Sequence, residues 1–168
     1  RMLFFGFSSG LPLLLVIGTL GFRLREAGVE LSTIGFFSWV GLIYGFKWVW
    51  APFVDRMPVP GLTRLLGRRR AWLLVAQVAI ALGLAGLAAV DPQKSLAAFA
   101  ALALATAFAS ATQDIALDAY RIESAGEERQ AAYAAMYQTG YRLGMIWAGA
   151  GALAIAAWAA HGASGYDH

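Results

Sequence analysis

The sequence contains no cysteine and few charged side chains. Its 168 residues include 10 acidic and 13 basic side chains, which is 14% of the chain, whereas a typical soluble domain has about 25%. Without cysteine there is no disulfide framework and no thiolate metal site. The two histidines, His161 and His168, have no cluster of metal ligands beside them. The composition therefore argues against a disulfide-stapled or metal-bound soluble domain and favours a membrane protein.

Long stretches also lack charge altogether, namely residues 2–22, 71–90 and 95–113. A helix that crosses the hydrocarbon core needs about 20 such residues. Two more apolar stretches are each interrupted by a single cation, Lys47 in one and Arg142 in the other. We therefore predict an all-α transmembrane protein with five membrane-spanning helices, at about residues 3–24, 32–54, 71–90, 95–119 and 131–160.

The basic residues lie mainly in the short segments between these stretches. Five arginines fall between the second and third predicted helices, and cytoplasmic loops of membrane proteins are enriched in such residues. A cytoplasmic N-terminus places eight basic residues on the cytoplasmic side and three outside, Arg23, Arg25 and Lys94. We therefore predict a multi-pass protein with a cytoplasmic N-terminus. The net charge of +3 follows from this pattern, and no nucleic-acid partner is expected.

Small residues recur at a spacing of four within the apolar stretches. The first predicted helix contains Gly6 and Gly10, and the fifth contains Gly140 and Gly144. Glycines at this spacing allow two helix backbones to approach closely. Pro12 is expected to kink the first helix.

Besides Arg23 at the outer end of the first helix, four charged residues fall inside the predicted membrane helices, and their burial is expensive. Asp114 and Asp118 share one helix face, with Arg121 one turn further on. At 1.5 Å per residue, Lys47 and Asp114 both lie about 10–12 Å from the cytoplasmic end, which predicts an ion pair between them. Arg142 lies about 18 Å deep, near the bilayer centre. Either a set of structural ion pairs or a polar cavity that binds a solute and a proton accounts for these charges.

Enzymatic alternatives use the same two aspartates. Asp114 and Asp118 could hold Mg²⁺ for a diphosphate substrate, as in membrane prenyl- and phosphatidyl-transferases. Such sites need further acidic residues, which the predicted helices do not supply at membrane depth, and Lys47 would repel the ion. An intramembrane aspartyl protease needs aspartates from two separate helices. We therefore expect no enzyme, no metal and no cofactor.

The segment from Asp55-Arg56 to Gly67-Arg68-Arg69-Arg70 resembles the cytoplasmic loop signature of the major facilitator superfamily, Gly-x-x-x-Asp-Arg-x-Gly-Arg-Arg. It departs from that signature in having Ala51 at the first glycine and a longer loop. Four further segments are similar to the muropeptide permeases of the AmpG family, a resemblance that covers nearly the whole chain. They are GFSSGLP at 6–12, IGFFS at 34–38 with FKWVWAP at 46–52, SATQDIALDA at 110–119 and YRLGM at 141–145.

The resemblance implies a carrier of twelve or more helices that imports anhydro-muropeptides across the bacterial inner membrane, driven by protons and monomeric when complete. Acetyl-coenzyme A transporters are distant relatives with related motifs. The chain starts at Arg1 and ends after its fifth apolar stretch, so we expect it to be an incomplete N-terminal six-helix bundle, with the C-terminal bundle absent.

The resemblance also suggests roles for individual residues. The expected gating residues of the cytoplasmic loop are Asp55, Arg56, Gly67, Arg68, Arg69, Arg70 and Arg121. The candidates for substrate or proton handling are Lys47, Gln113, Asp114, Asp118 and Arg142. Tyr137 and Tyr141 could stack on sugar rings or pack in the core.

Overall fold

The computed structural model describes residues 2–19, 21, 24–25, 28, 40–124 and 126–164. Within this part of the chain every regular element is helical, and there is no strand. Three of its helical segments are long and apolar enough to cross a membrane: Arg68–Ala89, Leu96–Ser124 and Glu127–Ala159. The first helix, Met2–Leu14, is apolar but shorter. The all-helical, membrane-spanning character predicted from composition is therefore confirmed.

The first two predicted helices are interrupted in the structure. Helix α1 (Met2–Leu14) runs through Pro12 and then widens into a π-helical turn, η1 (Leu15–Thr19). The second predicted helix lies partly outside the described residues. Its described part consists of α4 (Val40–Phe46), the 3₁₀ turn η2 (Lys47–Val49) and α5 (Ala51–Arg56).

The loop predicted between the second and third helices contains a short helix, α6 (Leu62–Leu66). Glycines flank it at Gly61 and Gly67, whose φ angles of 77° and 80° suit glycine better than any other residue. Helix α7 (Arg68–Ala89) begins three residues before the predicted start, so the three consecutive arginines form its first turn.

The remaining helices are longer than predicted. Helix α8 (Leu96–Ser124) continues five residues past the expected end at residue 119, because Arg121 and Glu123 make ion pairs that hold this extra turn. After η3 (Glu127–Arg129), α9 (Gln130–Ile146), the π-helical η4 (Trp147–Gly151) and α10 (Ala152–Ser164) follow one another without a break. Helix α10 therefore extends past the predicted end at residue 160.

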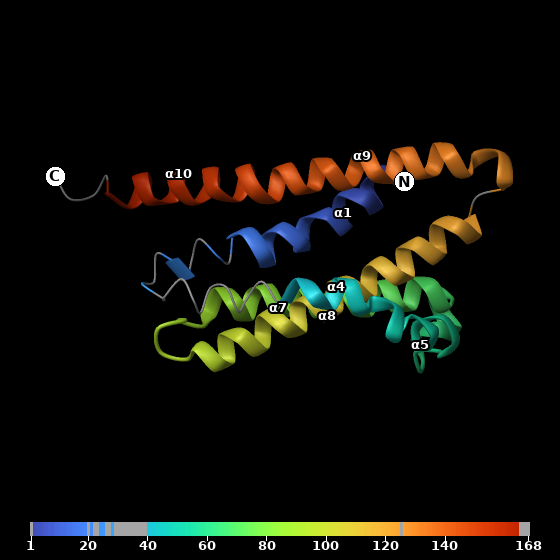
Figure 1. Ribbon diagram of the computed structural model, residues 1–168, viewed down its shortest axis with the longest axis horizontal. Coiled ribbons are helices and arrows are strands. Elements are labelled where there is room, and N and C mark those ends of the chain that lie inside the picture. The colour runs from blue at the N-terminus through green and yellow to red at the C-terminus, as the bar shows by residue number, and fades with distance from the viewer. Residues whose placement is uncertain are drawn as a thin grey trace.

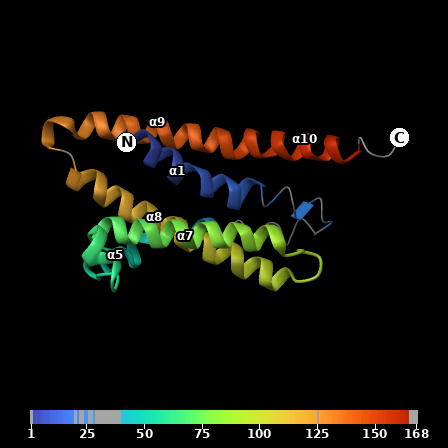
Figure 2. The ribbon, with the colours of Figure 1, turned by 180° about the vertical axis from the view of Figure 1, so that it is seen from behind.

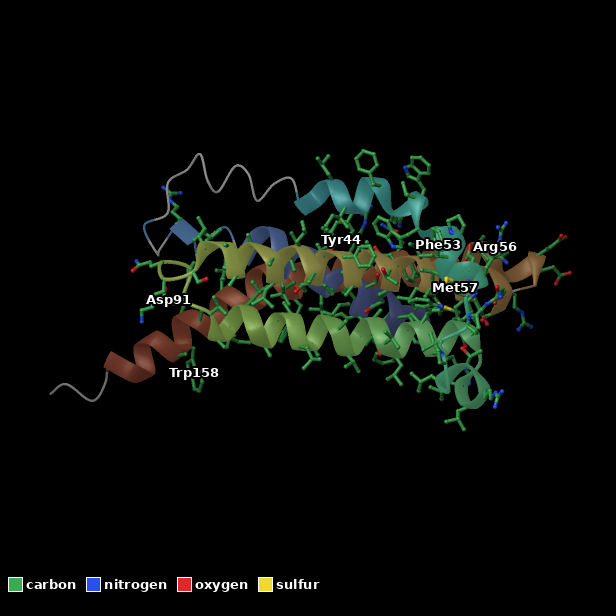
Figure 3. The ribbon with its side chains drawn as sticks, turned by 90° about the horizontal axis from the view of Figure 1, so that it is seen from below. Tyr44, Phe53, Arg56, Met57, Asp91 and Trp158 are labelled. Carbon is green, nitrogen blue, oxygen red and sulfur yellow. The ribbon has the colours of Figure 1, made fainter. Side chains whose placement is uncertain are left out.

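Two views from opposite sides show α1 lying between the long rod of α9 and α10 and the group formed by α4, α7 and α8 (Figures 1 and 2). Helices α7 and α8 form an antiparallel pair joined by a turn at Asp91, whose carboxylate accepts a hydrogen bond from the Gln93 backbone N–H over 3.0 Å. Figure 3 shows Arg56 and Asp91 at opposite ends of this bundle. The arginine-rich loop and the α7–α8 turn thus lie at opposite ends, as their predicted positions on opposite sides of a membrane require.

Helices α1 and α9 pack through glycines on both sides. A Cβ atom on Gly6 or Gly10 would collide with the backbone of Tyr137 or Tyr141. A Cβ atom on Gly140 would collide in the same way with the backbone around Leu3. Backbone cannot move aside as a side chain can, so the close approach of the two helices depends on these glycines. The prediction that their spacing permits tight packing is confirmed.

Gly10→Ala is expected to lower the free energy of unfolding by about 1–3 kcal/mol, because the added methyl group overpacks a backbone contact. Gly45→Ala is the matched control, since a Cβ atom at Gly45 of α4 would meet nothing within 4 Å. Thermal unfolding of the detergent-solubilised protein measures both variants. Equal melting temperatures for Gly10→Ala and the parent protein would contradict the account of this contact.

Candidate functional site

The buried polar face of α8 centres on Asp114, whose residue surface is 8% exposed. Ser9 on α1 donates a hydrogen bond from Oγ to Asp114 Oδ1. The hydroxyl of Tyr137 on α9 donates to Ser9 Oγ over 3.1 Å. The carboxylate is therefore satisfied by a hydroxyl group, and the chain Tyr137–Ser9–Asp114 connects three helices.

Sequence reasoning missed Ser9. The signal was present, since Ser9 lies beside Gly10 in a helix whose glycines mark a contact with another helix. Small polar residues at such contacts often hydrogen-bond across helices. Its partner Asp114 is 105 residues away in the sequence, however, and the helix pairing that brings them together could not be read from either segment alone.

Lys47 pairs with Asp118. Its Nζ lies 3.8 Å from Asp118 Oδ2, and the two side chains are 37% and 42% exposed. The predicted ion pair between Lys47 and Asp114 is therefore wrong by one helical turn. The depth estimate counted Asp114 back from Arg121 as the helix end, but α8 continues to Ser124. Lys47 also lies in a 3₁₀ turn, which rises by about 2.0 Å per residue instead of 1.5 Å.

Asp118 lies on the side of the site that faces the arginine-rich end of the bundle. It also forms an ion pair with Arg121, whose Nη2 lies 3.6 Å from Asp118 Oδ1. A hollow of about 310 Å³ is lined by Lys47, Asp118 and Asp55 among others. Asp118 and Asp55 thus line the same hollow. The two aspartates of α8 thus have different surroundings: Asp114 is buried among hydroxyls and Asp118 is half-exposed between two cations.

Gln113 is fully buried, with 1% of its surface exposed. Its side-chain nitrogen has no hydrogen-bond partner among the described residues, and neither has the hydroxyl of Tyr44 on α4. Figure 3 shows Tyr44 directed from α4 toward α8. Nearby, Trp50 Nε1 donates to Thr112 Oγ1 over 3.2 Å. Unsatisfied buried donors are costly, so the Gln113 amide is a candidate donor to a solute or water.

The remaining predicted binding residues lie on α9. Tyr137 and Tyr141 have ring centroids 6.3 Å apart, and the Arg121 guanidinium lies 5.6 Å from the Tyr137 centroid. Tyr137 is buried and Tyr141 half-buried, and stacking on a sugar stays a prediction for both. Arg142 is exposed, and no described residue forms an ion pair with it.

A second cluster of charges lies beyond this face, at the end of α7. Arg69 Nη1 lies 2.5 Å from Asp55 Oδ1, and Arg69 Nη2 lies 2.7 Å from Glu123 Oε1. The Arg69 side chain is only 13% exposed, so it is largely enclosed by its partners. The structure thus brings together two of the predicted gating residues, Asp55 and Arg69, and adds Glu123, which sequence reasoning placed in a loop.

The other predicted gating residues have no such contacts. Arg56, Arg68 and Arg70 are exposed and form no ion pair within the described ranges. Gly67 supplies the positive φ that starts α7, which is a backbone role. Arg121 belongs to the Asp118 site described above. The described residues also contain no group of three His, Cys, Asp or Glu side chains able to hold a metal ion.

Residues 2–157 match the protein family described as acetyl-coenzyme A transporter 1. The chain belongs to this family. It is 43% identical, over 92% of its length, to the anhydromuropeptide permease of Escherichia coli K12, of which it covers 31%. It is 38% identical, over 90% of its length, to putative transporter AmpG 4 of Rickettsia conorii, of which it covers 36%.

These relatives confirm the resemblance to AmpG permeases that the helix motifs indicate. The chain spans about a third of the length of the curated relatives it matches. Together with the three apolar spans, the transporter relatives identify a multi-pass membrane protein.

Arg69→Ala is expected to lower the free energy of unfolding by about 1–2 kcal/mol, because two carboxylates lose their shared partner. Arg68→Ala, an exposed neighbour without an ion pair among the described residues, should change it by less than about 0.5 kcal/mol. Thermal unfolding in detergent compares the two. If both variants melt together with the parent protein, the Asp55–Arg69–Glu123 cluster does not stabilise the fold.

Proposed function

We propose that the complete protein is a proton-coupled secondary transporter that imports anhydro-muropeptides across the bacterial inner membrane. The observation that carries the proposal is the carboxylate of Asp114, buried among three helices and held by a hydroxyl group. Such a group can bind a proton without breaking an ion pair. The permease names of the relatives support the transport reaction and the class of substrate.

The architecture that fits this function is part of a six-helix bundle of the major facilitator type. Five membrane-spanning helices would form this portion, with a cytoplasmic N-terminus beside the arginine-rich loop. A second bundle, encoded elsewhere in the same reading frame, would complete a monomeric carrier. The match to only about a third of each relative supports a longer protein. Carriers of this kind bind solute near the midplane, between their two halves.

Within this bundle, different polar and charged residues bind the proton, bind the solute and close the mouth of the site. Asp114 takes up the proton that drives transport. Gln113 offers a buried amide donor to the amide or hydroxyl groups of a muropeptide. Arg142, exposed on α9, offers a cation to its peptide carboxylates. The Asp118 pair with Lys47 and the cluster around Arg69 close the cytoplasmic mouth and open during the cycle.

Transport of coenzyme A esters is the second candidate, favoured by the description of the matching family. The surroundings of the two aspartates argue against a Mg²⁺-dependent transferase. Asp118 lies between Lys47 and Arg121, which would repel a divalent cation, and Asp114 is enclosed.

Uptake of a labelled anhydro-muropeptide by cells expressing the complete reading frame tests the proposal. We expect Asp114→Asn to reduce uptake at least tenfold and a protonophore to abolish it, while Asp91→Asn, in the exposed α7–α8 turn, leaves it unchanged. Excess unlabelled muropeptide should compete and acetyl-coenzyme A should not. Uptake that persists with the protonophore would refute proton coupling, and competition by acetyl-coenzyme A alone would favour the second candidate.

A further inference from the structure

A chain of two hydroxyl groups leads from Asp114 to α9. Ser9 Oγ donates to the carboxylate, and the Tyr137 hydroxyl donates to Ser9 Oγ over 3.1 Å. Ser9 is 1% exposed and Tyr137 is 9% exposed, so water does not compete freely for these bonds. The carboxylate is therefore joined to the contact between α1 and α9, while Lys47 forms its ion pair with Asp118.

The direction of these hydrogen bonds depends on the charge of Asp114. An ionised carboxylate only accepts hydrogen bonds, so Ser9 must donate to it and accept from Tyr137. A protonated carboxyl group has an O–H of its own and can donate to Ser9. Ser9 then no longer has to donate to Asp114, and the bond to Tyr137 can reverse. Protonation of Asp114 on α8 thus changes the bonding of a residue on α9.

The backbone around Ser9 leaves little room to absorb that change. Gly6 and Gly10 bring the α1 backbone against the backbone of Tyr137 and Tyr141, so the two helices cannot slide closer. Beyond this contact both helices contain a π-helical turn, η1 and η4, and these turns contact each other. Such turns are frequent at functional sites and are places where helices bend.

We propose that Ser9 and Tyr137 are positioning residues that couple the protonation of Asp114 to the packing of α1 against α9. The proposal rests on the proposed function, because it takes Asp114 as the proton-binding group. The other titratable side chains that act on Asp114 are Lys47 on η2, Tyr44 on α4, Asp118 on α8 and Tyr141 on α9. Helix α1 has no acidic or basic residue within Met2–Leu14.

The pH dependence of muropeptide uptake tests this role in cells expressing the complete reading frame. Ser9→Ala removes a donor from the ionised carboxylate, so Asp114 holds its proton to higher pH. The alkaline midpoint of uptake should move up by about one pH unit. Tyr137→Phe should move it in the same direction by less, and Ser9→Thr, which keeps the hydroxyl, should restore it. The neighbouring changes Ser8→Ala and Tyr133→Phe are the controls and should leave the midpoint in place.

An unchanged midpoint in Ser9→Ala and Tyr137→Phe, with uptake still abolished by Asp114→Asn, would overturn this proposal and leave the proposed function intact. Uptake without any pH dependence in the parent protein would overturn the proposed function itself. If Ser9→Ala does not accumulate in the membrane, Tyr137→Phe decides the question alone. It retains the ring and removes only the hydroxyl, so an unchanged midpoint there refutes the coupling.

Discussion

The arrangement of this bundle depends on one costly group, a carboxylate buried in an apolar helix. Asp114 lies in a segment of α8 that is buried on all sides from Ala109 to Leu117. An unpaired charge in such a place is unfavourable by several kcal/mol. Here the requirement is met by a hydroxyl of α1, which is bonded in turn to a hydroxyl of α9. The glycines that let α1 and α9 meet are therefore part of the same site.

The three acidic positions toward the arginine-rich end differ in how they are neutralised. Asp114 is bonded to Ser9, Asp118 is shared by Lys47 and Arg121, and Asp55 shares Arg69 with Glu123. Exposure of the carboxylate side chain rises toward the end of the bundle, where each acidic group is held by an ion pair instead of a hydroxyl group. Under the proposed function, the inner group binds the proton and the outer pairs open and close the mouth of the site. This gradient is the physical basis for assigning transport and gating to different residues.

Much of this could be predicted from local patterns, and the failures have a common cause. Helices α7 and α8 could be predicted because a helix that crosses the bilayer needs a long stretch without charge. The spacing of four residues between Asp114 and Asp118 likewise places both on one face of α8. Partners were harder to predict: Lys47 was paired with the wrong aspartate, and Ser9 and Glu123 were missed. Each error depends on where a helix ends or which helix it meets, as with the extra turn of α8. Helix ends and helix partners are determined by contacts between segments about 50 to 130 residues apart in the sequence. The periodicity of one segment contains no information about such contacts.

The central claim is that Asp114 binds a proton that moves with the solute. Proton movement can be measured directly in de-energised cells that express the complete reading frame, with a pH electrode in a weakly buffered medium. Adding anhydro-muropeptide should make the medium more alkaline as protons enter with the solute, and Asp114→Asn should abolish the signal while Asp91→Asn preserves it. Muropeptide entry without any change in external pH would contradict the account.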